Sequence, residues 1–572
     1  PWPTLQGLQG ELVFERQGMK LSAASARLGE GRQAIQIAQL RADIPQLAKD
    51  PQLNLQAELK GPAQQVLRTL AQSPVDRMLS GALTQATASG NLQGKLNLTI
   101  PILRSQDSKL QGSVSLSGND VQMAPHVPML GKAQGTVQFT ETGFSLQGVQ
   151  TRLLGGTSRL EGGLRAGNIP AGEPRLLIRA QGQITADGLR AARNLQPLDT
   201  LGRQAKGQTG YTATLGWRNG QPEISVRSSL EGLELNLPAP LGKRAAQALP
   251  LAISTKVLDT PPAGSRDQLQ IDIGSMVSAV YVRDLSGPSP RVVRGNLAIG
   301  TRTGGASSLP EQGVSAVVRL DDLPLDAWEA ALPSTATADD GDDAWRSYLP
   351  NRLGLQTGTL TTQGRTLHDV VAGITRDGTT WRANIDAREL SGHAQYNQPG
   401  RQQPARLFAR LARLNLPPSA VGEVESIMET PPTAMPALDI QIDDLVLRGK
   451  RLGRVEIEAT NQESRSPRVG AVREWQLQKF NVTVPEAALR ASGRWAAPAD
   501  NRPRRTEMTF RLEVQDAGAL LTRLGTPEAL RAGAGQLEGQ IGWNGSPLAL
   551  HYPSLQGQFQ IKMGRGQFLK AD

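Results

Sequence analysis

The sequence of 572 residues contains no cysteine, which excludes disulfide bonds, thiolate metal sites and a cysteine nucleophile. Histidine is nearly as scarce, and the residues His126, His368, His393 and His551 show no metal-ligand spacing. The sequence has no Gly-x-Ser-x-Gly elbow, and the acidic run Asp339 to Asp343 lacks the spacing of a calcium loop. We therefore expect no enzyme, no cofactor and no bound metal.

Aromatic residues and long apolar runs are also rare. Phe, Trp and Tyr make up 4% of the chain, and no apolar run approaches the roughly 20 residues of a membrane-spanning helix. The formal net charge of +10 comes from basic residues that are spread along the chain, so we expect no nucleic-acid partner. The sequence starts at Pro1 and stops inside a strand-like run, Gly566 to Leu569, and we interpret it as an internal fragment of a longer protein.

A short pattern recurs instead: an apolar residue, any residue, Gly, any residue and a second apolar residue. Residues two apart share one face of a strand, so each unit places two apolar groups and a glycine on the same side. Its copies are Leu8–Gly10–Leu12, Leu92–Gly94–Leu96, Leu110–Gly112–Val114, Leu537–Gly539–Ile541 and Leu555–Gly557–Phe559.

Alternation of apolar and polar residues predicts half-buried antiparallel strands along most of the chain, for example at 53–59, 96–100, 271–273 and 510–514. Short helices are expected at 62–72, 241–249, 326–332 and 518–524, and loops include 461–467. The predicted fold is all-β: a long, twisted antiparallel sheet that curls into an open hydrophobic groove, with a few short helices. We divide this one continuous groove into segments 1–258, 259–436 and 437–572, without sharp boundaries between them.

The glycines on the apolar face allow two interpretations. In a groove, each would leave room about one side chain wide for a guest molecule. Alternatively, they mark bulges, tight twists or close backbone contacts. The repetition of the pattern and the scarcity of covering helices favour the groove.

Strand parity assigns the residues that line this groove; the alternative is an ordinary sandwich core. Neighbours such as Gln138, Asp272 and Arg511 should face water. The predicted lining residues are Leu12, Phe14, Leu96, Leu98, Ile100, Val114, Leu116, Val137, Phe139, Ile271, Ile273, Ile440, Ile442, Val455, Ile457, Phe510, Leu512, Val514, Ile541 and Phe559.

Several segments carry a resemblance to a known family. In order, they are Trp2-Pro3 with Leu8 to Phe14, Gly131 to Gly156, Leu235 to Lys243, Ala437 to Ala459, Ala491 to Trp495 and Gly564 to Leu569. Together they resemble the YhdP branch of the AsmA-like proteins, to which TamB is related.

The resemblance implies a bridge-like lipid transporter of the Gram-negative envelope. Such a protein would lie in the periplasm, carry phospholipid acyl chains in a β-groove between inner and outer membranes, and be anchored by an amino-terminal helix that this sequence lacks. Its contacts with the two membranes would lie in segments outside this sequence. The resemblance implies no particular protein partner.

The sequence also allows three other functions or architectures. The chain could be a β-stalk with a self-filled core, an assembly factor for the outer membrane as TamB-type relatives were first viewed, or an outer-membrane barrel. The scarcity of aromatic residues argues against the barrel, which needs aromatic girdles.

Overall fold

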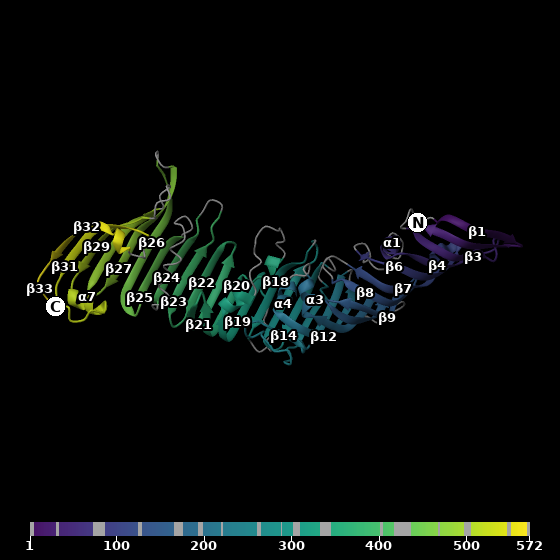
Figure 1. The fold of residues 1–572 in the computed structure, drawn as a ribbon, viewed down its shortest axis with the longest axis horizontal. Coiled ribbons are helices and arrows are strands. Elements are labelled where there is room, and N and C mark those ends of the chain that lie inside the picture. Colours follow the sequence, from purple (N-terminus) through teal and green to yellow (C-terminus); the bar gives the residue numbers. More distant parts are fainter. Residues whose placement is uncertain are drawn as a thin grey trace. The chain divides into compact units, whose positions relative to one another are not determined.

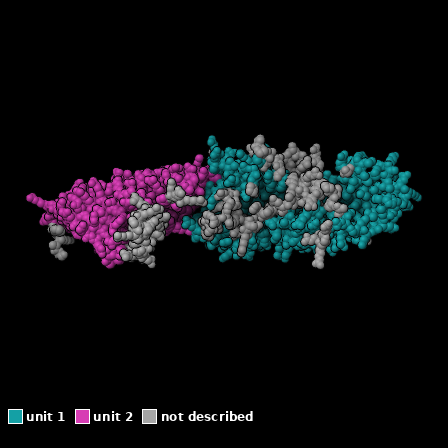
Figure 2. Space-filling view, turned by 90° about the horizontal axis from the view of Figure 1, so that it is seen from above, with its two compact units in different colours: residues 1–313, 327–349 teal, residues 314–326, 350–572 magenta. Residues whose placement is uncertain are grey.

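The computed structural model describes residues 5–29, 34–71, 86–123, 128–164, 176–192, 198–218, 221–259, 265–287, 289–300, 309–331, 345–400, 404–416, 436–466, 470–496, 505–545 and 551–568. Contacts divide the chain into two compact units (Figure 2). Unit 1 comprises residues 1–313 and 327–349, and unit 2 comprises residues 314–326 and 350–572. Each unit is built mainly from strands, as the alternation predicts.

The sheet of unit 1 is antiparallel and follows the order of the chain (Figure 1). Each strand pairs with the next, except that β5 pairs with β7 and β14 pairs with β12, so that β4 meets β6 and β13 meets β15. The strands are β1 (Leu5–Glu15), β2 (Gly18–Leu28), β3 (Ile35–Ile44), β4 (Gln52–Pro62), β5 (Thr87–Ala88), β6 (Asn91–Pro101), β7 (Lys109–Gln122), β8 (Leu130–Thr140), β9 (Gly143–Leu153), β10 (Gly156–Leu164), β11 (Leu176–Thr185), β12 (Ala205–Arg218), β13 (Gln221–Ser228), β14 (Leu233–Leu235), β15 (Leu251–Val257), β16 (Arg266–Ile273), β17 (Val277–Asp284) and β18 (Arg291–Ile299).

The sheet of unit 2 is mixed. The pairs β19–β20 and β24–β25 are parallel, and the other pairs in the series to β32 are antiparallel. The predicted all-β fold with antiparallel strands and few short helices is therefore confirmed, with these two parallel pairs as exceptions. The strands are β19 (Gly313–Pro324), β20 (Arg352–Thr362), β21 (Arg365–Asp377), β22 (Thr380–Asp386), β23 (Leu390–Asn397), β24 (Arg406–Leu416), β25 (Ala437–Leu447), β26 (Lys450–Ser466), β27 (Gly470–Val484), β28 (Ala487–Ala496), β29 (Arg505–Val514), β31 (Gly535–Asn544) and β32 (Gln556–Met563), with a separate pair of β30 (Leu530–Ala532) and β33 (Gly566–Phe568).

Helices are short, and most lie in the connections between strands. They are α1 (Ala63–Ala71), α3 (Ala186–Ala191), α4 (Leu198–Arg203), α5 (Leu325–Ala331) and α7 (Ala517–Arg523), with 3₁₀ turns η2 (Ile102–Asp107), η3 (Trp345–Tyr348) and η5 (Tyr552–Ser554). The helices expected at 62–72, 326–332 and 518–524 are confirmed by α1, α5 and α7. The pair α3 and α4 was not expected.

Two local predictions were wrong because tertiary partners override local preference. Residues 241–249 form turns, since Lys243 exchanges backbone hydrogen bonds with Leu235 and its buried ammonium donates to the carbonyl oxygens of Leu230 and Leu233. The loop expected at 461–467 is instead strand up to Ser466, because the start of β27 pairs with the end of β26.

The glycines of the recurring pattern permit close approach and leave no open space. A Cβ on Gly10 would lie 2.5 Å from Cα of Ala23, and one on Gly539 would lie 2.7 Å from Cβ of Phe559. At Gly112 the space is taken by the ring of Phe139, a residue directly opposite on β8. The idea that these glycines make room for a guest was therefore wrong, and the close-contact alternative holds.

We predict that Gly112→Ala destabilises unit 1 by about 1–3 kcal/mol, because its Cβ would collide with Phe139 and lie 2.7 Å from the Lys95 carbonyl oxygen. Gly373→Ala on β21 is the matched control, since nothing lies within 4 Å of a Cβ there. Urea unfolding of both variants measures the difference, and equal midpoints would contradict this account of the glycines.

Candidate functional site

Cross-strand register in unit 2 aligns apolar residues into rows on one face of the sheet. Directly opposite residues on paired strands point to the same side, so a row of such partners marks one continuous face. Two rows cross the seven strands from β25 to β29, β31 and β32. The first is Ile440, Ile457, Phe480, Ala491, Phe510, Gly539 and Phe559, and the second is Ile442, Val455, Val482, Leu489, Leu512, Leu537 and Ile561.

Unit 1 carries equivalent rows on what we call, in each unit, the apolar face. One follows β2 to β13 through Ala26, Ile37, Leu59, Gly94, Val114, Val137, Leu146, Gly162, Ile178, Leu215 and Ile224. Another follows β9 to β18 through Val149, Leu160, Ala180, Ala213, Val226, Ile253, Ile271, Ala279 and Leu297.

The register places all the residues that we expected to line a groove on the apolar face of their own unit. Their exposure differs widely. Ile442, Val455 and Leu98 are buried, Leu12, Phe14 and Phe559 are more than half exposed, and the others are half-buried. That they line a lipid path stays a prediction.

The residues expected to face water lie on the opposite, polar face. Gln138 and Arg511 are exposed. Asp272 is only half-buried, and its carboxylate accepts hydrogen bonds of 2.7 Å from Gln270 and Ser278.

Strand parity missed Phe480, which belongs to the first row of unit 2. The register shifts between Leu477 and Phe480, so one extra residue of β27 sits in a bulge and both side chains keep to the same face. At a bulge, the alternation of apolar and polar residues shifts by one position. The spacing of three between Leu477 and Phe480 is the signal in the sequence that could have revealed this bulge.

Part of the apolar face is filled by the protein's own side chains. Trp475 and Trp495 meet edge to face at a centroid distance of 6.5 Å, and register continues through Thr506 to Trp543. All three indoles are at most 3% exposed. The Trp475 indole N–H donates to the Pro436 carbonyl oxygen over 3.2 Å.

A buried ion pair interrupts the apolar face of unit 1. Nε of Arg283 donates to Asp267 over 2.9 Å, and Asp267 is 3% exposed. Burial alone would lower the pKa of Arg283, but hydrogen bonds to Asp267 and Tyr348 outweigh it, so the net pKa is raised and the guanidinium stays charged.

This pair holds η3 against the same face. The Tyr348 hydroxyl lies 3.3 Å from Arg283, and its ring meets Tyr281 edge to face at 5.2 Å. The backbone N–H of Val292 donates to the Ser347 hydroxyl over 2.9 Å. The apolar face at β16 to β18 is therefore partly covered by η3.

The polar face carries partly exposed ion pairs. Lys479 and Glu456 approach to 2.6 Å, and Arg494 and Glu507 to 2.7 Å. Hydrogen bonds from Arg494 hold the pKa of Glu507 below its usual range. Partly exposed pairs of this kind contribute little stability each, so they mark which side of the sheet meets water.

Within the described ranges, no group of three or more His, Asp or Glu side chains could hold a metal ion. His126 and the run Asp339 to Asp343 lie outside the described residues. No helix in the described part of the chain is long and apolar enough to cross a membrane.

Comparison with known proteins confirms the family resemblance. A family model described as YhdP protein matches residues 1–572. The chain belongs to the YhdP family. The intermembrane phospholipid transporter YhdP of Escherichia coli (strain K12) is 20% identical over 600 residues, which cover 99% of this chain and 42% of that relative. The chain thus spans less than half of the relative's length, and no solved structure matches it.

We predict that Asp267→Ala destabilises unit 1 by about 3–5 kcal/mol, because it leaves a buried guanidinium without its partner. A double variant, Asp267→Leu with Arg283→Met, should recover most of this loss. Hydrogen exchange of the β16 to β18 amides measures the effect.

The control is Arg388→Ala, which removes the partner of Asp369 in a pair that is about two-thirds exposed on both sides. Its cost should stay below about 1 kcal/mol. A loss at Asp267 no larger than that of the control would show that the pair does not hold this face together.

Proposed function

We propose that this protein carries phospholipids between the inner and outer membranes of a Gram-negative envelope and catalyses no reaction. Acyl chains would lie on the apolar face while the polar face meets water. The observation that supports this most strongly is the continuity of the apolar rows. They cross strand after strand, and many of their side chains stay half-buried or exposed.

The energetics favour such a surface. A phospholipid has roughly 30 methylenes, and each costs about 0.8 kcal/mol in water, so an unaided crossing costs on the order of 20 kcal/mol. Seven strands at about 4.8 Å spacing give each row of unit 2 a length near 30 Å. Half the hydrocarbon core of a bilayer is only about 15 Å thick, so a row is long enough for an extended acyl chain.

Family membership and the relative's printed name support the cargo and the setting. On this proposal the protein works in the periplasm and is held at the inner membrane by a helix outside the present sequence. Phospholipids are its ligands, and both membranes are its partners.

The buried indoles of Trp475, Trp495 and Trp543 favour a second candidate, a structural stalk whose core is filled by its own side chains. Native mass spectrometry of the purified chain separates the two. Co-purifying phospholipid supports transport, and a lipid-free protein supports the stalk.

We predict that a photo-crosslinker at Phe139 captures phospholipid and that one at Gln138 does not. The two positions are adjacent on β8 and face opposite sides of the sheet. On the polar face, the side-chain amide of Gln147 donates a hydrogen bond to the amide oxygen of Gln138 over 2.8 Å. Lipid capture is read by mass spectrometry after irradiation in cells. Equal capture at both positions would count against the assignment of faces.

We predict that Ile457→Asp or Leu512→Asp blocks lipid flux, because a carboxylate in an apolar row is costly to desolvate. Thr483→Asp is the matched control, since Thr483 is exposed on the polar face of the neighbouring strand β27. Flux is measured in cells that depend on the protein. Normal flux in the row variants, at normal protein levels, would defeat the proposal.

A further inference from the structure

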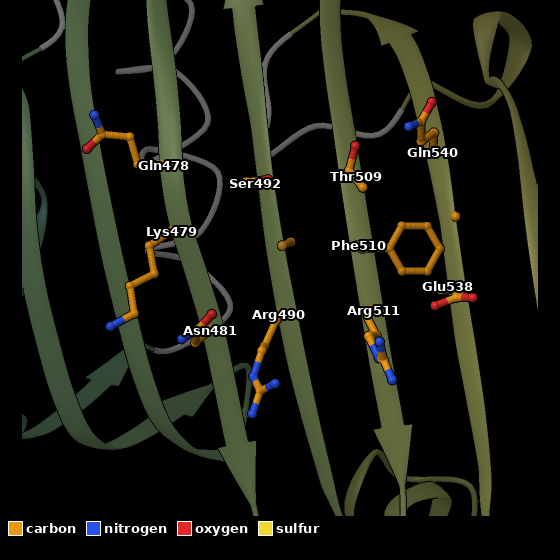
Figure 3. Close-up of a pocket in the computed structure, with 12 residues that line it drawn as sticks. Gln478, Lys479, Asn481, Arg490, Ser492, Thr509, Phe510, Arg511, Glu538 and Gln540 are labelled. Carbon is orange, nitrogen blue, oxygen red and sulfur yellow. The ribbon is translucent and has the colours of Figure 1, made fainter.

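Two arginines face each other on the polar face of unit 2. Arg490 on β28 and Arg511 on β29 are directly opposite in an antiparallel pair, which brings their Cα atoms to about 4.5–5.5 Å. Like charges at such positions are destabilising. Figure 3 shows the two guanidinium groups extending in the same direction from adjacent strands.

The charges around the two arginines are equal in number but are unevenly paired. Arg511 has Glu513 at 3.0 Å on its own strand and Glu538 directly opposite on β31. Lys479 is paired with Glu456. Arg490 is exposed and makes no ion pair with any described residue, since its other cross-strand neighbour is the neutral Asn481. Arg490 is therefore the cation of this group without an ion-pair partner, and it lies beside a second guanidinium.

A hollow of about 530 Å³ lies here, and its lining includes Lys479, Asn481, Arg490, Arg511 and the acidic Glu538. Ser492, Thr509 and Gln540 lie directly opposite one another in the next row and add hydroxyl and amide donors to the lining. Guanidinium groups bind oxyanions through paired N–H donors, and two of them with nearby hydroxyls suit a multiply charged tetrahedral oxyanion.

We propose that this hollow is a binding site for a phosphate group. The site lies on the face opposite the apolar rows, so it goes beyond the proposed lipid path and does not depend on it. A bound phosphate offsets the repulsion between Arg490 and Arg511. The phosphate can belong to the headgroup of a membrane lipid or to a free phosphate compound.

The test titrates the chain with inorganic pyrophosphate by calorimetry at constant ionic strength. Arg490→Gln should weaken binding by about tenfold or more, because it removes a charge-assisted contact. Arg494→Gln is the matched control, since Arg494 lies on the same face of the same strand but is paired with Glu507. Binding to the control should change less than about twofold.

A second measurement follows the thermal midpoint in chloride alone. Arg490→Gln should raise it, because the variant relieves the repulsion with Arg511. Absence of pyrophosphate binding to the unaltered chain, or equal weakening in both variants, overturns the proposal.

Flotation with vesicles identifies the source of the phosphate. Binding to phosphatidylglycerol vesicles that is lost in Arg490→Gln supports the site with a lipid headgroup as ligand. Pyrophosphate binding without vesicle binding supports it with a free phosphate compound. Neither result requires lipid transport, so the site and the proposed function can fail separately.

Discussion

Everything in this fold depends on register between neighbouring strands. Side chains alternate with period two, so a slip of one residue would turn the whole apolar set of a strand toward water. Rows that cross seven strands in unit 2 and more in unit 1 require each pairing to agree with the one before it. Bulges maintain this agreement where a strand holds an extra residue, as β27 does between Leu477 and Phe480.

The sequence predicts the strands and the faces well where alternation is unbroken. Leu96 to Ile100 and Phe510 to Val514 are assigned correctly because period two is visible without any partner. Phe480 is missed because a bulge is defined by two strands together. The turns around Lys243 are missed for a similar reason, since its ammonium binds carbonyl oxygens of a segment ten or more residues away.

The spacing of the glycines in the sequence does not by itself show what they do on the apolar face. At Gly112 and Gly295 an aromatic ring from the neighbouring strand, Phe139 or Tyr281, occupies the place of the missing side chain. The ring covers the glycine backbone and adds apolar area without a gap, which is how aromatic residues compensate for glycine in sheets. A guest would therefore lie on top of the rows and not in holes between them.

A surface of this kind has consequences for selectivity. Leu, Ile, Val and Phe offer no hydrogen bonds, so the rows can favour apolar chains but cannot recognise a headgroup. Discrimination by chain length is weak as well, because one methylene more or less changes burial by only about 0.8 kcal/mol. The protein's own side chains cover the apolar face at two places. One is the cluster of Trp475, Trp495 and Trp543, and the other is η3, which Tyr348 and Arg283 hold in position. If lipids move along these rows, the two covered places limit the width of the lipid path. The uncovered stretches only make the path apolar.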